Sequence, residues 1–180
     1  MAGRRKKSTR YLTLSAIVAA MGVVLLALGS FIEVLDLSMA AVASLGVIFA
    51  VLELGGKYPY LIYAVTALLS LLLLPTKTPA VVYTLLLGYY PILKAKLEGF
   101  LPGAVAWVLK LLIFNGALAL VVLLTTKLLM PGVPLFEEPY GYWFLVACTP
   151  VFAVYDVALT RLITFYLRRL RHRLRFLHED

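Results

Sequence analysis

The stretch that decides the fold is residues 10–31, RYLTLSAIVAAMGVVLLALGSF. It carries no charge after Arg10, and about 20 residues at 1.5 Å rise cross the roughly 30 Å hydrocarbon core of a bilayer. We therefore expect a transmembrane helix from about Tyr11 to Phe31. The basic string Arg4-Arg5-Lys6-Lys7 before it is similar to the start of a signal peptide, but the apolar run is too long for one and another follows. The run is interpreted as an uncleaved first span with its basic flank in the cytoplasm.

The composition of the whole chain points the same way. Of its 180 residues, 63% are hydrophobic and 14% are charged, whereas soluble domains have about 45–50% and about 25%. The apolar residues form long blocks that do not alternate with polar ones, which makes membrane-spanning β-strands a poor alternative. The sequence therefore predicts an all-α integral membrane protein with six transmembrane helices. The expected helices cover about 11–31, 38–54, 59–74, 80–93, 104–129 and 142–167.

The distribution of charge predicts the direction of the spans. Cytoplasmic loops of membrane proteins are enriched in Lys and Arg. Here basic residues gather in residues 1–10, at Lys57, in an expected loop over 94–103, and in the tail from Arg168. The other loops hold mainly acidic groups, at Glu33, Asp36, Glu137 and Glu138. We expect both termini in the cytoplasm of a multi-pass protein of the cell membrane.

Three segments follow from this topology: a basic cytoplasmic N-terminus (1–10), a transmembrane domain (11–167) and a basic amphipathic tail (168–180). The net charge of +8 is then explained by topology, so nucleic acid is not expected as a partner. In the tail, leucines at helical spacing are interleaved with arginines. Such a helix lies on a membrane surface and binds anionic lipids, with docking of a protein partner as the alternative.

Signatures of catalysis and metal binding are missing from the sequence. The single Cys148 excludes an internal disulfide and a cysteine-based metal site, and His172 and His178 both lie in the charged tail. No GxSxG, HExxH, P-loop or GxGxxG string occurs. We expect a protein without enzymatic activity, cofactor or metal.

Small residues mark two stripes on the first expected helix. Ser15, Ala19, Gly22 and Gly29 form one stripe, and Ala16 with Ala20 forms a second small-xxx-small pair. Small side chains allow membrane helices to approach closely, because lipid provides no hydrophobic drive for their association. Packing on the second helix is the simpler interpretation, and a docking face for another membrane protein is the alternative.

Polar residues inside the expected spans need partners, because a charge at the bilayer centre costs about 2.5–3.5 kcal/mol on insertion scales. By depth, Lys110 is predicted to meet Asp156, and Glu53 to meet Arg161. Structural ion pairs and a polar cavity for substrate or protons are both open interpretations. The buried polar set comprises Glu53, Lys110, Asn115, Asp156 and Arg161. Near Lys94, the string Tyr89-Tyr90-Pro91 is interpreted as an inner helix end.

A second group of candidate residues lies on the outer side. Aromatic residues there are typical of an interface belt, and the alternative is the mouth of a ligand pocket, where aromatic walls surround a few polar groups. The candidate ligand-binding residues are Glu33, Asp36, Tyr140, Tyr142 and Trp143.

The first expected helix also resembles a known family. The string Arg10-Tyr11-Leu12-Thr13-Leu14-Ser15-Ala16-Ile17-Val18-Ala19-Ala20 is similar to the first helix of the substrate-binding S components of energy-coupling factor (ECF) vitamin transporters. In that family an Ala-x-x-x-Ala stretch meets a transmembrane coupling subunit, and Ala16 and Ala20 match it. The resemblance implies a six-helix subunit that binds a small vitamin-like molecule from outside and works with ATPases. A solitary relative without a transport role is compatible with the same match.

Two other function classes stay open. A membrane scaffold, like the cell-shape membrane proteins that include MreD, has similar size and six helices. A proton-coupled carrier or membrane enzyme would use Glu53, Lys110 and Asp156.

Overall fold

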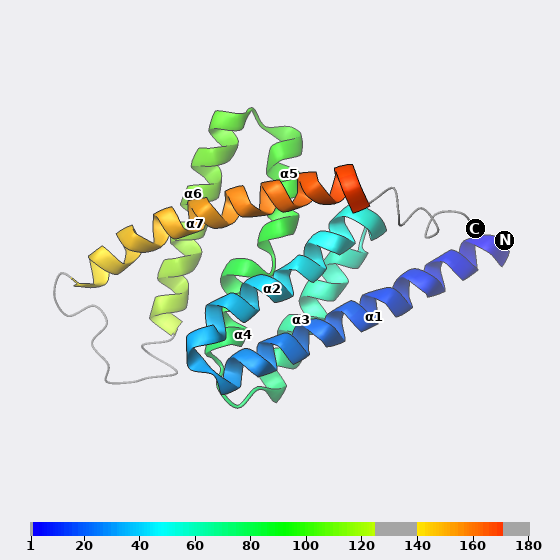
Figure 1. Ribbon diagram of the computed structural model, residues 1–180, viewed down its shortest axis with the longest axis horizontal. Helices are drawn as coiled ribbons and strands as arrows, with labels where there is room; N and C mark the ends of the chain where they lie inside the picture. Colours follow the sequence, from blue (N-terminus) through cyan, green and yellow to red (C-terminus); the bar gives the residue numbers. More distant parts are fainter. Residues whose placement is uncertain (1, 125–139, 171–180) are drawn as a thin grey trace. The chain divides into compact units, whose positions relative to one another are not determined.

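The structure is a computed structural model that describes residues 2–124 and 140–170. Throughout this part of the chain every element is a helix and no strand occurs. The chain divides into two compact units, residues 1–135 and 136–180, so helices α1 to α6 belong to the first unit and α7 to the second (Figure 1).

Within residues 2–124, the first unit contains six α-helices and three short helical turns of other types. Its elements are α1 (Ala2–Phe31), the 3₁₀ turn η1 (Glu33–Leu35), α2 (Asp36–Phe49), the π-turn η2 (Ala50–Leu54), α3 (Tyr58–Leu73), α4 (Thr78–Val82), the π-turn η3 (Tyr83–Leu87), α5 (Tyr90–Phe100) and α6 (Gly103–Leu124). The second unit contains α7 (Tyr140–Phe165) and the π-turn η5 (Tyr166–Leu170).

Within residues 2–124 and 140–170, four segments are long and apolar enough to cross a membrane, judged by length and composition. They are Thr9–Phe31, Asp36–Leu54, Gly103–Leu124 and Val146–Arg169, and α3 is a shorter apolar helix. At 1.5 Å per residue, the 23 residues of the first extend over about 35 Å, which matches a hydrocarbon core. The prediction of an all-helical membrane protein is thus confirmed, while the count of six spans and their direction stay predictions.

Helix α1 packs on α2 and α3 through its small residues (Figure 1). A Cβ on Gly22 would lie 3.0 Å from a methyl of Thr66 in α3, and one on Gly46 of α2 would lie 2.7 Å from Cγ1 of Val18. Backbones at these sites approach too closely for larger side chains. The first small-residue stripe therefore serves internal packing, and all of its members are buried: Ser15, Ala19, Gly22 and Gly29.

Hydrogen bonds join the end of α1 to the turn between α3 and α4. The Oγ atoms of Ser30 and Thr76 lie 2.7 Å apart, and the Thr76 hydroxyl also lies 3.0 Å from the carbonyl oxygen of Ser30. The backbone N–H of Thr76 donates to Ser30 Oγ at 3.1 Å. These bonds satisfy a carbonyl that a helix end leaves without an intrahelical partner.

The fourth expected helix was predicted to be continuous to Leu93, and this is wrong. Between α4 and α5 the chain passes through a π-turn, in which the N–H of Gly88 donates to the carbonyl of Tyr83 at 2.6 Å. Pro91 has no N–H to continue the preceding helix, and it lies instead in the first turn of α5. The Tyr89-Tyr90-Pro91 string therefore begins a helix and does not end one.

Tyr63 of α3 stabilises this break. An α-helical Gly88 would donate its N–H to the carbonyl of Thr84, but the π-turn directs it to Tyr83. The Tyr63 hydroxyl donates to the Thr84 carbonyl at 2.8 Å and so replaces the lost bond. The Tyr63 ring also lies against the rings of Tyr83 and Tyr89, with centroid distances of 6.2 and 6.5 Å. A backbone carbonyl exposed by the break is thereby satisfied within the protein.

Between residues 140 and 170, the second unit contains one long α-helix followed by a π-turn. Helix α7 continues through Pro150, which lacks the N–H of a regular helical residue, and ends in η5 at Leu170. The expected sixth helix over 142–167 is therefore found. The remainder of the basic tail, 171–180, lies outside the described residues.

Candidate functional site

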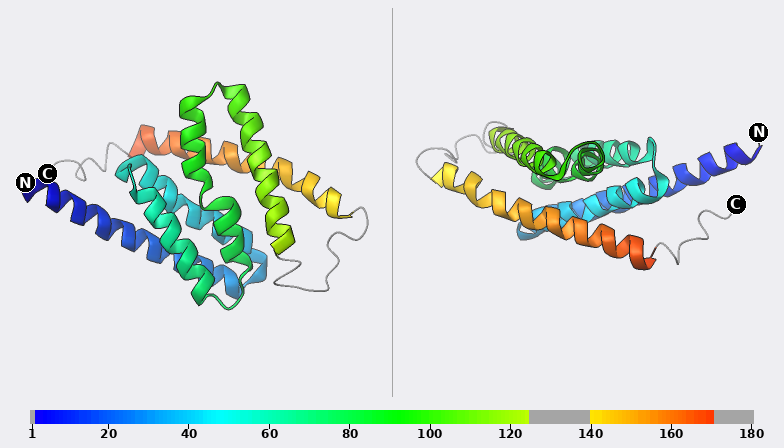
Figure 2. Two further views of the ribbon diagram at one scale, coloured as in Figure 1. Left: turned by 180° about the vertical axis from the view of Figure 1, so that it is seen from behind. Right: turned by 90° about the horizontal axis from the view of Figure 1, so that it is seen from above.

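Helices α5 and α6 form a hairpin whose turn extends beyond the turn between α2 and α3 (Figure 2). The sequence predicted a loop over 94–103, but α5 continues to Phe100 and the turn contains only Leu101 and Pro102. No helix-breaking residue occurs between Leu93 and Gly99, which explains why the helix does not stop at the first lysine. The hairpin places Lys94 and Glu98 of α5 beside Lys110 of α6.

These three residues form an ion-pair cluster, referred to here as the hairpin charge cluster. The Nζ atoms of Lys94 and Lys110 lie 2.8 and 2.5 Å from the same oxygen, Oε1 of Glu98. Both lysines are 1% exposed, whereas the Glu98 side chain is 45% exposed. Lys110 Nζ also lies 5.6 Å from the centre of the Trp107 ring, within the range of a cation–π contact. Two buried ammonium groups thus share one half-exposed carboxylate.

The lysines fix the protonation state of Glu98, which lies outside the four helices long enough to span a membrane. Partial burial by itself raises the pKa of this carboxyl group. Hydrogen bonds and charge from Lys110 and Lys94 outweigh the effect of burial and bring the pKa below its ordinary value of 4.5. Glu98 is accordingly ionised at neutral pH, as the lysine pair requires.

The predicted buried polar residues divide between the two units. Lys110 belongs to the hairpin charge cluster, Glu53 is buried in η2, and the Asn115 amide donates to the Leu111 carbonyl of its own helix at 2.9 Å. Asp156 and Arg161 lie on α7, where the Asp156 carbonyl accepts the Thr160 hydroxyl at 2.8 Å. The expected pairs of Lys110 with Asp156 and of Glu53 with Arg161 link different units and stay predictions.

The predicted outer ligand residues also divide between the units. Asp36 is the first residue of α2, where its negative charge interacts favourably with the positive end of the helix dipole. Glu33 lies in η1, and the remaining candidates open α7. A pocket mouth built from them stays a prediction, because the following side chains lie outside the described part: Glu33, Tyr140, Tyr142 and Trp143.

The second small-residue pair of α1 lies on its exposed side. Ala16 and Ala20 are both exposed, although Ser15 and Ala19, the residues before them, are buried. Successive helical residues lie about 100° apart, so the pair occupies the flank next to the buried stripe. Large apolar side chains continue this exposed side: Leu12, Ile17, Met21, Val24 and Leu28. The pair forms a shallow, small-residue surface, referred to here as the alanine face.

No known protein family, characterised protein or solved structure matches this chain. The resemblance of residues 10–20 to the ECF S components therefore stays a prediction. Among the described residues, no three or more His, Cys, Asp and Glu side chains gather into a possible metal site.

Two members of the hairpin charge cluster, Lys94 and Glu98, were missed as candidate site residues. Their i,i+4 spacing, which favours an ion pair on one helical face, is visible in the sequence. The signal was lost because Lys94 was assigned to a cytoplasmic loop, where a lysine needs no partner.

Proposed function

We propose that this chain is a membrane subunit with six spans and both termini in the cytoplasm, located in the cell membrane. It binds a small vitamin-like molecule and docks onto a transmembrane coupling subunit that ATPases drive, as an ECF-type uptake system does. It has no enzymatic activity of its own. The observation that carries this proposal is the exposure of Ala16 and Ala20 beside a stripe already used for internal packing.

The two sides of α1 differ in a way that suits this role. The buried stripe already accounts for the packing of α1 on α2 and α3. The alanine face is not needed for that packing, and small residues there allow a partner helix to approach closely. The family resemblance assigns the same two alanines to coupling.

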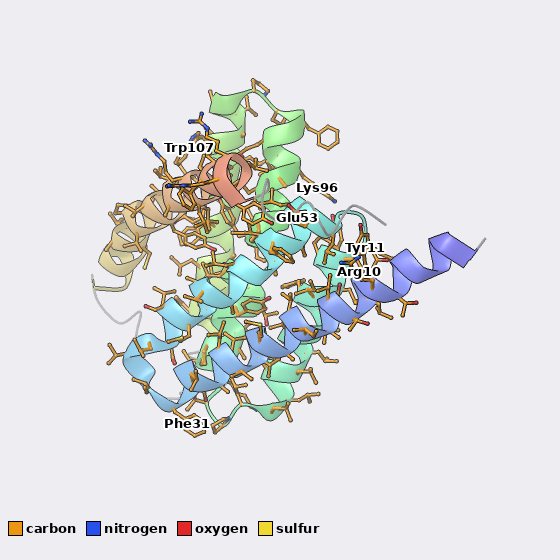
Figure 3. All side chains as sticks on the ribbon, turned by 45° about the vertical axis from the view of Figure 1, so that its right-hand side comes forward. Arg10, Tyr11, Phe31, Glu53, Lys96 and Trp107 are labelled. Atoms are coloured by element: carbon orange, nitrogen blue, oxygen red, sulfur yellow. The ribbon has the colours of Figure 1, made fainter. Side chains whose placement is uncertain are left out.

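The arrangement of charge within the first unit supports the proposed direction of the spans. Arg10 and Lys96 lie toward one end of the unit and Phe31 at the other (Figure 3). Lys57, in the turn between η2 and α3, follows the second candidate span. Basic groups on one side of a bilayer indicate the cytoplasmic side.

Substitutions on adjacent positions of α1 test the docking function. Ala16→Leu and Ala20→Leu should leave the detergent-solubilised protein folded but prevent co-purification of a coupling subunit with its ATPases. Ala16→Ser keeps the residue small and should retain the partner. Ala19→Leu is the matched control, because Ala19 is 2% exposed and a leucine there should lower the melting temperature.

Retention of the coupling subunit by Ala20→Leu would remove the docking argument.

Native mass spectrometry of the purified chain with a vitamin panel tests the ligand separately. If no vitamin binds while the coupling subunit is retained, the ligand class is wrong and the docking function stands. If the partner depends instead on residues after Leu167, a truncated chain loses it, and the scaffold alternative is favoured.

A proton-coupled carrier or membrane enzyme is the second candidate function, and the hairpin charge cluster favours it. Buried ionisable groups in membrane proteins often mark paths for ions or substrates. Lys110→Met would then abolish transport or turnover in a protein that stays folded. A drop in melting temperature with activity retained would assign the cluster to structure.

A further inference from the structure

Aromatic and basic side chains gather at the end of the first unit that lies opposite Phe31. The rings of Tyr11 and Tyr58 meet edge to face, with centroids 5.5 Å apart. Lys96 Nζ lies 5.2 Å from the centre of the Tyr60 ring. Figure 3 shows Arg10, Tyr11 and Lys96 toward this end. The name "basic–aromatic end" is used below for Arg10, Tyr11, Lys57, Tyr58, Tyr60 and Lys96.

The charge that this end presents to its surroundings is positive. Lys57 and Lys96 are exposed, and Tyr60 is 42% exposed. Of the acidic residues nearby, Glu53 is buried and Glu98 accepts hydrogen bonds from two ammonium groups. The other acidic groups of the described first unit, Glu33 and Asp36, follow the opposite end of α1.

The position of this end along the helices corresponds to headgroup depth. Arg10 and Tyr11 begin the candidate span Thr9–Phe31, and Lys57 follows the candidate span Asp36–Leu54. A span of this length with one end at a membrane interface reaches the other interface at its second end. Tyrosine rings are enriched at that level, with the ring toward the hydrocarbon and the hydroxyl toward water.

We propose that the basic–aromatic end binds the headgroups of anionic lipids, with Lys57 and Lys96 contacting lipid phosphates. Tyr60 holds Lys96 by a cation–π contact and lies at the boundary with the acyl chains. This surface is separate from the basic tail and does not depend on the alanine face or on any transport role. Each lysine at an anionic surface contributes about a five-fold gain in lipid affinity, so the pair contributes about 25-fold.

The experiment measures melting of the full-length chain in neutral detergent titrated with dioleoyl phosphatidylglycerol or with dioleoyl phosphatidylcholine. The wild type should be stabilised by the anionic lipid only. The double variant Lys57→Gln with Lys96→Gln should need a roughly 25-fold higher concentration of the anionic lipid for the same stabilisation. The basic tail is unchanged in this variant, so its contribution to lipid binding stays the same. Lys57→Arg with Lys96→Arg should respond as wild type, and Lys77→Gln, in the turn between α3 and α4, is the control at the opposite end of the unit.

Three results of the lipid titration would overturn the inference. They are equal stabilisation of the wild type by both lipids, an unchanged response of the double glutamine variant, and an equal loss in Lys77→Gln. Inorganic phosphate, added at the lipid concentration, should have no effect. Competition by phosphate would assign the site to a free anion and would overturn the lipid assignment. Circular dichroism of each variant before the titration verifies folding, which the exposure of Lys57 and Lys96 leads us to expect.

Discussion

Replacing Glu98 with glutamine should destabilise the first unit more than removing either lysine of the hairpin charge cluster. Glu98→Gln keeps the shape of the side chain but removes the negative charge that Lys94 and Lys110 share. Both lysines are 1% exposed, so water does not readily replace the lost carboxylate. Lys110→Met leaves a carboxylate that is 45% exposed and retains Lys94, and methionine fills much of the lysine volume.

The expected magnitudes follow from this asymmetry of burial. Breaking a buried ion pair by removing one partner costs about 3–5 kcal/mol. Because Glu98 is half-exposed, the lower value of about 3 kcal/mol applies to Glu98→Gln. In Lys110→Met the Glu98 carboxylate is hydrated, so the free energy of unfolding should fall by only about 1 kcal/mol. The double variant Glu98→Gln with Lys110→Met should be more stable than Glu98→Gln alone, because one of the two buried ammonium groups is gone.

Reversible unfolding in mixed micelles, by titration with a denaturing detergent, measures these differences. The two single variants and the double variant form a double-mutant cycle with the wild type. Equal stability of Glu98→Gln and Lys110→Met, or additive effects in the double variant, would refute the reasoning. A double variant less stable than Glu98→Gln would refute it as well.

Three other predictions concern the broken fourth helix and the acid response. Gly88→Ala should lower the free energy of unfolding by about 1–3 kcal/mol, because the alanine Cβ would lie 2.8 Å from the Tyr83 ring and carbonyl. The same unfolding titration measures this loss. Gly99→Ala is the control, since its Cβ meets nothing within 4 Å and alanine favours the helix by about 0.5–1 kcal/mol. Tyr63→Phe should lower the free energy of unfolding by about 1–3 kcal/mol, because the Thr84 carbonyl loses the hydroxyl that donates to it. A variant as stable as the wild type, within experimental error, would refute that role of Tyr63. The folded-state pKa of Glu98 is below 4.5, so its contribution to stability is complete above pH 4.5 and is lost as pH falls through the folded pKa. Melting curves from pH 6 to about pH 3 should show this loss in wild type and a smaller one in Glu98→Gln.

The elements that follow from local pattern were predictable from the sequence. Residues 10–31 form a helix because a long apolar run has no other way to satisfy its backbone in a membrane. Gly55 and Gly56 have φ angles of 61° and 52°, which glycine adopts without strain, and they form the turn in the gap between the expected helices 38–54 and 59–74. The first small-residue stripe is buried by internal packing, but only part of it meets the second helix as expected, since Gly29 lies against Met39 of α2 and Gly22 against Thr66 of α3.

The hairpin charge cluster was not predictable in the same way, because it depends on contacts between helices. Pro91 was interpreted as the end of a helix, whereas proline fits equally well in the first turn of a new one. Once α5 is placed after that break, Lys94 becomes a buried residue and needs a carboxylate. Depth along the spans suggests Asp156 as a partner of Lys110, and that pair stays a prediction because it links the two units. Depth does not show that Glu98 of the neighbouring helix α5 lies beside Lys110.

The central claim, that the alanine face docks a coupling subunit, is tested most directly by crosslinking from adjacent positions of α1. In a Cys148→Ser background, Ala20→Cys and Met21→Cys place a thiol at nearly the same depth, about 100° apart around the helix. Both native side chains are exposed, so a lipid-soluble photoactivatable label attached to the thiol faces whatever covers either site. The account predicts an adduct with a membrane subunit that co-purifies with ATPases from position 20 and much less from position 21. No adduct from position 20, or equal adducts from both positions, would contradict it.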